Sequence, residues 1–395
     1  MKIKRSILAP VLVAFAALAS GGWLLQRGAS QQGNVYQQAR LFEAVLHQIS
    51  ERFVDEKDPA TLYRMAIDGL LHELGDPHTT LMTPREYNQL RLETQGEYGG
   101  LGIQIGRRDG WITVIAPLRG TPAERAGLQA GDRIIEVDGV STKGWSEDEA
   151  VARLRGPRGS PVELKVWRSG VDAPIPFRIV RDEIKVSPLG AAYLIDRRVG
   201  YVELQRFSES STDSLRAAID RLRRQGMRGL ILDLRRNPGG LLEQGVAVSD
   251  LFLGRGQTVV ETRSRIAMQN QRYTATEGDQ YPGMPIVVLV DRSSASAAEI
   301  VAGALQDHDR ALIVGETTYG KGSVQTLFEL PGGNHLKLTT ARWYTPVGRS
   351  IQRPYNTSGL PVEEGEEEGA PAEADSAKPA EVFRTDGGRI VYGGG

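Results

Sequence analysis

The sequence contains no cysteine in its 395 residues, which excludes disulfides, thiol nucleophiles and thiolate metal sites. Its five histidines are scattered, and none belongs to an HExxH motif or to a closely spaced pair. The sequence therefore predicts no metal site and no cofactor. The chain also lacks an excess of one charge, because its 48 Lys and Arg residues nearly balance its 49 Asp and Glu residues. A balanced chain offers no basic field, so nucleic-acid binding is not expected.

One long apolar run stands at the N-terminus. Three basic residues precede residues 7–25, which carry no charge. A run of this length and flanking charge enters a membrane, and it is just long enough to span one. The tripeptide at residues 17–19 also fits a signal-peptidase site, so residues 1–29 are predicted to be a cleaved signal peptide or a retained anchor. Either way the bulk of the chain is expected outside the cytoplasm, in the periplasm or on the extracytoplasmic face of the inner membrane.

Residues 30–95 have the apolar spacing of helices. Asp58 and Pro59 look like the cap and first-turn proline of a second helix that runs through Leu74. The first helix carries a stripe of apolar residues: Phe42, Val45, Leu46, Ile49 and Phe53. The stripe suits packing within the chain or on a second copy of it, so a homo-oligomer is one expected state.

Short β-type runs broken by glycine fill residues 96–181, which predicts a compact β-rich domain. Gly99, Gly100 and Gly102 would expose successive backbone N–H groups beside an edge strand. Such a loop suits the terminal carboxylate of a peptide that adds to the sheet as a strand. Glycine is also common in turns for steric reasons, so this feature alone does not decide the matter.

The remainder of the chain is mostly of α/β type. Strand and helix patterns alternate over residues 182–358, which predicts a sheet flanked by helices with its ligands at the carboxyl ends of the strands. Residues 359–382 lose every aromatic residue and gather Glu, Ala, Pro and Gly, a composition that predicts a disordered acidic insertion. A strand-like piece, residues 383–395, follows it.

Three serines lie where a predicted strand gives way to a predicted helix, at positions 293, 294 and 296. A serine at a helix start is exposed and close to unpaired amides, as a nucleophile for acyl transfer requires. Helix capping explains the same position without chemistry. No GxSxG motif occurs in the chain, so an α/β-hydrolase elbow is not predicted.

A lysine between glycines supplies the base that the serine needs. Lys321 stands in the run YGKGSVQ, and Gln325 follows four residues later. A lysine in such a place is either a solvated turn residue or a desolvated amine whose pKa falls towards neutrality. In the second case it can take the proton of a serine, and Gln325 could orient it.

Together these motifs identify a family. The run SASAAE, the lysine 25 residues after Ser296, Gln325 and the run LDLRRNPGGLL at residues 232–242 resemble the carboxyl-terminal processing proteases, also called tail-specific proteases. The order of elements over residues 96–181 resembles a PDZ domain of the bacterial protease type. The likeness implies an α/β protease core of the crotonase/ClpP-like type, with an inserted PDZ-like domain and an N-terminal helical segment. It also implies that the end of the core is truncated at Gly395.

The resemblance assigns roles residue by residue. Ser296 would be the nucleophile, Lys321 the general base and Gln325 the residue that positions Lys321. The oxyanion hole would be made by the backbone N–H groups of Ala297 and of Gly239 or Gly240.

Further roles follow from the same likeness. Ser294 would be structural or a helix cap, Asp307 would support the site, and His308 is expected at a helix end. The C-terminus of a bound peptide would lie against Gly100, Leu101, Gly102 and Ile103.

The sequence thus predicts an exported serine endopeptidase that selects protein or peptide substrates by accessible C-terminal tails. The alternative is a catalytically inactive, membrane-tethered peptide-binding scaffold, although such a scaffold has no need of a neutral lysine beside a serine. A thioester-using enzyme of the crotonase type is a third interpretation, and it would leave the PDZ-like domain without a purpose.

Overall fold

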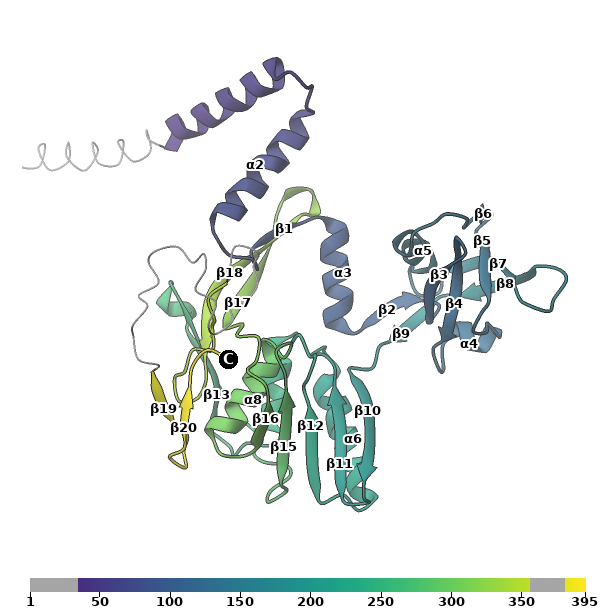
Figure 1. The fold of residues 1–395 in the computed structure, drawn as a ribbon. Coiled ribbons are helices and arrows are strands. Elements are labelled where there is room, and N and C mark those ends of the chain that lie inside the picture. The colour runs from purple at the N-terminus through teal and green to yellow at the C-terminus, as the bar shows by residue number, and fades with distance from the viewer. Residues whose placement is uncertain (1–34, 356–380) are drawn as a thin grey trace, which may run out of the picture. The chain divides into compact units, whose positions relative to one another are not determined.

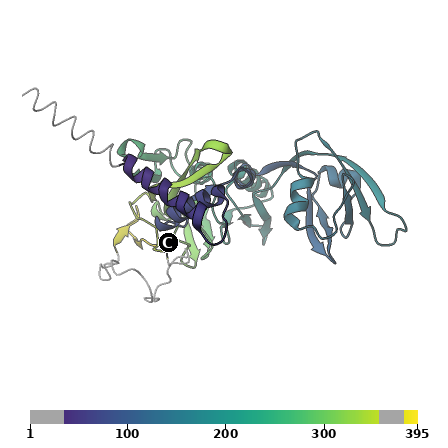
Figure 2. The same cartoon turned by 90° about the horizontal axis from the view of Figure 1, so that it is seen from above.

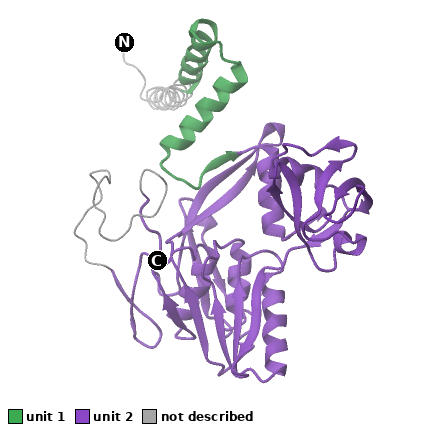
Figure 3. Ribbon diagram, turned by 45° about the vertical axis from the view of Figure 1, so that its right-hand side comes forward, with its two compact units in different colours: residues 1–81 green, residues 82–395 purple. Residues whose placement is uncertain are grey.

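A computed structural model describes residues 35–355 and 381–395 of the chain. The chain divides into two compact units, Met1–Leu81 and Met82–Gly395, shown in green and purple in Figure 3. The predicted signal or anchor and nearly all of the predicted acidic insertion lie outside the described residues. Within the described residues, no helix is both long and apolar enough to cross a membrane.

The first unit consists of two helices. One covers residues 35–52, and α2 spans Pro59–Glu73. Asp58 caps α2 by accepting a hydrogen bond from the Thr61 N–H (3.1 Å), as predicted for an Asp-Pro start. The apolar stripe of the first helix stays exposed, with Phe42 at 49% and Phe53 at 52%.

The second unit opens with α3 (Pro84–Gln95), which has a capping box at its start and a left-handed Gly96 at its end. Two short antiparallel strands, β2 (Glu97–Gly100) and β9 (Asp182–Lys185), lead into and out of the β-rich domain. Helix α3 belongs to the same compact unit as the domains that follow it. The boundaries predicted from composition instead place α3 with the N-terminal helices, in residues 30–95. The domain boundaries therefore stay predictions.

The β-rich domain has one sheet in the order β3-β4-β5-β7-β8, with β6 paired to β5. Figures 1 and 2 draw it in blue and teal. Its apolar core lies between the sheet and two short helices. The elements are β3 (Ile103–Arg108), β4 (Trp111–Pro117), α4 (Pro122–Ala126), β5 (Arg133–Val137), β6 (Val140–Ser141), α5 (Glu147–Leu154), β7 (Pro161–Trp167) and β8 (Ile175–Val180). The β-rich character predicted from the short runs broken by glycine is confirmed.

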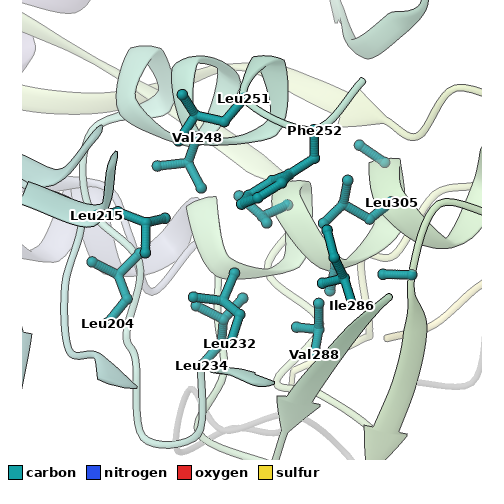
Figure 4. Packing of buried hydrophobic residues seen from close by; sticks show 14 of the residues in the cluster. Leu204, Leu215, Leu232, Leu234, Val248, Leu251, Phe252, Ile286, Val288 and Leu305 are labelled. Atoms are coloured by element: carbon teal, nitrogen blue, oxygen red, sulfur yellow. The ribbon is translucent and has the colours of Figure 1, made fainter. Parts of the chain in front are cut away.

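The α/β core is built on a sheet in the order β10-β11-β12-β15-β16, parallel except for β10. Apolar side chains from this sheet and from three helices pack into one cluster (Figure 4). The predicted alternation is confirmed by β11 (Val199–Leu204), α6 (Ser211–Arg224), β12 (Gly229–Asp233), α7 (Leu242–Asp250), β15 (Ile286–Val290), α8 (Ala297–Asp307) and β16 (Leu312–Gly315). The antiparallel edge strand β10 (Leu189–Ile195) was not predicted.

A second antiparallel sheet was also missed. In it β18 (His335–Tyr344) pairs with β17 (Ser323–Glu329) and with β13 (Thr258–Ser264), and β13 pairs with β14 (Gln271–Thr274). The remaining elements are β1 (Thr80–Met82), two 3-10 turns, η1 (Ala267–Gln269) and η2 (Pro331–Gly333), and a hairpin of β19 (Val382–Arg384) and β20 (Ile390–Tyr392). The hairpin confirms the strand-like pattern near the end of the sequence.

Candidate active site

The turn from β15 into α8 holds the predicted nucleophile. Ser296 is the N-cap of α8, and its backbone has φ 54° and ψ −115°, a conformation that a non-glycine residue rarely adopts. Several bonds fix the turn before it. The Ala295 N–H donates to the Asn237 carbonyl (2.9 Å), and the buried Ser294 hydroxyl donates to the Leu234 carbonyl (2.8 Å). The structural role predicted for Ser294 is confirmed, and Ser296 stands half-buried at the end of a turn held by these bonds.

The NPGG loop packs directly on that turn. A Cβ added to Gly239 would lie 2.7 Å from Ser296 Cβ and 2.9 Å from the Ala297 nitrogen, so only glycine fits there. The Gly239 N–H already donates to Asn237 Oδ1 (2.8 Å). The Gly240 N–H has no acceptor among residues 35–355 and 381–395. Of the two glycines predicted for the oxyanion hole, Gly240 is therefore the one whose N–H group is available to donate.

A buried carboxylate ties the serine turn to the lysine loop. Glu299 Oε2 accepts from the backbone N–H of Ser296 (2.6 Å) and of Lys321 (3.0 Å). Its Oε1 accepts from the Gly320 N–H (2.6 Å) and the Thr318 hydroxyl (2.7 Å). Burial raises the pKa of Glu299 above the ordinary value, while these four bonds oppose the rise. The carboxylate is 3% exposed, and it fixes the backbone of both predicted catalytic residues.

Sequence reasoning missed Glu299, although the Ser-x-x-Glu spacing is that of a capping box. That spacing predicts the bond to the Ser296 N–H. Nothing local predicts the bonds to a loop more than 20 residues away, so the wider role of the glutamate had no sequence signal.

The predicted catalytic side chains line one cleft. Its cavity has a volume of about 640 Å³, and Ser296, Lys321, Gln325 and Gly240 are among its lining residues. Gln325 Nε2 donates to Ser323 Oγ (2.9 Å) and to Thr339 Oγ1 (3.1 Å). These bonds hold the amide, and its oxygen remains the atom that can accept from an amine.

An ionic cluster supports the start of the NPGG loop at the carboxyl end of β12, and it too was missed. Asp233 is 3% exposed and pairs with Arg235 (Nη2 to Oδ2, 2.6 Å). The Tyr201 hydroxyl donates to the same oxygen (2.6 Å). Burial alone would raise the pKa of Asp233, but the bonds from Arg235 and Tyr201 outweigh it and hold the pKa below the ordinary value. Burial, reinforced by Asp233, raises the pKa of Tyr201 to about 12.

Asp307 and His308 lie at the far end of α8 from Ser296, roughly 16 Å away at 1.5 Å per helical residue. Asp307 is fully buried and pairs with Arg349. His308 is the C-cap of α8, as predicted, and its ring nitrogens contact Asp386 Oδ2 and the Thr258 carbonyl, both at 2.7 Å. Asp307 and His308 thus join α8 to earlier and later segments of the chain, and neither is among the residues that line the cleft around Ser296.

The β-rich domain has its own small cavity, of about 60 Å³. Leu101, Gly102 and Ile103 line it, whereas Gly100 lies in β2, paired with Asp182. Among the described residues no acceptor occurs for the N–H groups of Leu101 and Gly102. The other lining residues are Tyr98, Ile105, Val151, Leu154 and Arg155. Two unpaired amides at one end of an apolar pocket suit a peptide carboxylate and its last side chain.

Comparison with known proteins agrees with this geometry. Residues 198–358 match the model of peptidase family S41, and residues 113–168 match the PDZ domain. The carboxy-terminal-processing protease of Bartonella bacilliformis is 42% identical over 339 residues, which is 85% of this chain and 77% of that protein. The chain belongs to peptidase family S41.

A second relative gives the same result. The carboxyl-terminal-processing protease of Synechocystis is 41% identical over 80% of this chain and 74% of its own length. Among solved structures, the photosystem II D1 C-terminal processing protease is 32% identical, with a TM-score of 0.43 over 81% of this chain and 84% of that one. This S41 member is a serine peptidase of the carboxy-terminal processing type with a PDZ domain. The recognition from sequence motifs is confirmed.

Proposed function

We propose that this S41 peptidase is an exported serine endopeptidase that captures C-terminal tails with its PDZ domain and cuts the chain with a Ser296–Lys321 dyad. One observation carries the catalytic part of the proposal. The buried Glu299 carboxylate accepts hydrogen bonds from the N–H groups of both Ser296 and Lys321. By fixing the backbone at both positions, the carboxylate supports a catalytic pair, whose chemistry depends on precise positioning.

In the acylation step, neutral Lys321 Nζ takes the proton of Ser296 Oγ as the oxygen attacks the scissile carbonyl carbon. The carbonyl oxygen gains the negative charge and accepts hydrogen bonds from the N–H groups of Ala297 and Gly240. The Lys321 ammonium then gives its proton to the amide nitrogen, the C–N bond breaks, and the new amine terminus leaves. Gln325 orients Lys321 through its amide oxygen.

In the second step a water molecule replaces the leaving peptide. Lys321 takes a proton from the water, whose oxygen attacks the ester carbon and displaces Ser296 Oγ. The proton returns to the serine and the carboxylic product leaves. The helix start at Ala297 favours the negative charge in both steps.

The PDZ domain serves capture in this proposal. The tail would add as a strand beside β3, with its carboxylate on the Leu101 and Gly102 amides. Gly100 would shape the loop from β2 rather than touch the ligand. The chain beyond the tail would then reach Ser296, in a core whose fold we expect to be of the crotonase/ClpP-like type.

Export and membrane contact rest on the N-terminal sequence alone, through its basic start and its uncharged run. A homo-oligomer through the first unit is supported by the exposed stripe that includes Phe42, Val45 and Phe53.

The test uses the detergent-solubilised full chain and an unstructured substrate protein with an apolar C-terminal tail. We expect cleavage that depends on the tail and falls when the tail ends in two aspartates. Binding of the tail without any cleavage would favour the inactive scaffold, and cleavage that ignores the tail would remove the PDZ domain from the selection step.

A further inference from the structure

The cleft around Ser296 is lined almost entirely by uncharged side chains. Only Lys321 and Glu243 among its lining residues carry a charge. The polar neighbours include Thr262, Ser264, Gln269, Gln271, Tyr273 and Thr340. The lysine belongs to the proposed chemistry, so Glu243 is the one charged group of the cleft that catalysis does not use.

Glu243 is exposed and has no ion pair among the described residues. Its charge nevertheless reaches the wall of the cleft, because it adds to burial in raising the pKa of Tyr273. A glutamate in the first turn of α7 also suits the helix dipole. That benefit would be the same for a carboxylate pointing at bulk solvent, and it does not account for the place of Glu243 among the cleft residues.

Glu243 also lies close to the proposed site of bond cleavage. It stands three residues after Gly240, whose N–H would hold the scissile carbonyl oxygen, and α7 begins between them, at Leu242. Gly240 and Leu241 precede the helix, and three Cα–Cα steps of about 3.8 Å span at most about 11 Å, the length of about three residues of an extended substrate at about 3.3 Å each. The carboxylate is therefore within reach of substrate side chains a few positions from the scissile bond.

We propose that Glu243 is a specificity-determining residue that makes the cleft prefer a basic side chain, and reject an acidic one, within three residues of the scissile bond. This inference rests on the proposed function and adds a charge rule to it. An unpaired carboxylate in a partly enclosed cleft attracts a lysine or arginine and repels an aspartate or glutamate. The PDZ domain would then choose the tail, and Glu243 would bias the point of cleavage.

The experiment compares two sets of substrates that share one apolar C-terminal tail and one cleavage site mapped by mass spectrometry. In the first set, each substrate has a lysine at one of the three positions on either side of that site. In the second set, glutamate replaces that lysine. For at least one position, we expect the full chain to give a kcat/KM about 5- to 10-fold higher with lysine than with glutamate at low salt. High salt should shrink this ratio because it screens the two charges.

Two variants at position 243 and one matched control complete the design. Glu243→Gln should bring the lysine-to-glutamate ratio close to one, and Glu243→Lys should invert it. Glu277→Gln removes an exposed glutamate outside the cleft and should keep the wild-type ratio. A ratio that stays the same in Glu243→Gln overturns the inference while cleavage itself still supports the proposed function. If the wild-type chain cleaves none of the substrates, the proposed function falls and the charge rule falls with it.

Discussion

The PDZ groove and the protease cleft would bind the same kind of object, an extended peptide, with opposite chemistry. The groove is a cavity of about 60 Å³ lined mainly by apolar side chains, with two amides without acceptors at its end. The cleft has about ten times that volume, at about 640 Å³, and many of its lining side chains are hydroxyls and amides. A small apolar pocket can select one terminal side chain, whereas a broad polar cleft can pass many sequences.

The PDZ domain and the protease core also differ in how they use a buried charged side chain. In the PDZ domain, Arg181 is 8% exposed and donates to the carbonyls of Leu154 (3.1 Å) and Pro161 (2.8 Å), so it stabilises the domain's own fold. In the core, Glu299 accepts from backbone groups of two distant segments that meet at the cleft. In the proposed function, recognition uses free backbone donors, while catalysis uses a buried charge that joins two loops.

The largest effect should come from the nucleophile. We expect Ser296→Ala to lower kcat by about 10⁴-fold or more and to leave tail binding by the PDZ domain intact. Cleavage of a labelled substrate and fluorescence anisotropy of a tail peptide measure the two separately. Ser293→Ala changes an exposed serine of the same turn and should retain activity. Substantial cleavage by Ser296→Ala would place the nucleophile elsewhere.

Loss of the base should be nearly as severe. Lys321→Arg keeps the positive charge but cannot lose its proton, so we expect about a 10³-fold loss of kcat/KM. Wild-type kcat/KM should rise with pH as the lysine amine deprotonates, and this rise should vanish in the variant. An arginine variant with the wild-type pH profile would show that the amine is not the base.

Glu299→Gln should have an intermediate effect, about 10- to 100-fold on kcat, because its NH2 group cannot accept from the Ser296 and Lys321 N–H groups. The raised pKa of Glu299 means that it takes up a proton at a higher pH than an exposed glutamate does. Activity should therefore fall on the acid side at a pH above the ordinary carboxyl range.

The Glu299→Gln variant should lose this acid limb of the pH profile. Glu316→Gln alters an exposed glutamate paired with Arg292 and should keep both rate and profile. An unchanged acid limb in Glu299→Gln would assign the titration to another group.

A smaller effect is expected at the carboxylate loop of the PDZ domain. A Cβ on Gly102, at φ +73°, would lie 2.4 Å from Thr121 Cβ. Gly102→Ala should thus weaken tail binding about tenfold and raise KM with little change in kcat. Gly110→Ala has a similar φ, +79°, and no atom within 4 Å of the added Cβ, so it isolates the backbone strain. If both variants weaken tail binding equally, the clash with Thr121 does not explain the effect of Gly102→Ala.

The smallest effect concerns the size of the tail residue. A cavity of about 60 Å³ should favour a C-terminal alanine over phenylalanine by about threefold in Kd. Leu154→Ala enlarges the pocket and should narrow that difference. Equal affinities for all four combinations would mean that the pocket does not hold the last side chain.

Local patterns in the sequence determined the repeated elements of the core and most of the PDZ strands. The stretch from β11 to β16 could be predicted because each strand is an apolar run and each helix has its own periodicity. The Ser296, Lys321 and Gln325 hypothesis came from motif spacing and family resemblance. The structure brings these three residues to one cleft.

The pairing of strands that lie far apart in the chain could not be predicted from the sequence. The sheet of β13, β14, β17 and β18 joins strands that lie up to about 80 residues apart, and its register has no local signal. For the same reason the sequence could not distinguish Gly239 from Gly240 as the oxyanion donor. The structure distinguishes them, because the Gly239 N–H already donates to Asn237 Oδ1.

The sequence by itself thus determined the family and the alternating elements of the core, and it supplied the Ser296, Lys321 and Gln325 hypothesis, because those depend on neighbours along the chain. Only the tertiary structure decided that Glu299 accepts hydrogen bonds from the backbone of both Ser296 and Lys321 and that Glu243 lines the cleft. A hydrogen bond or a field between distant residues depends on their separation in space, and that separation is set only when the whole chain has packed.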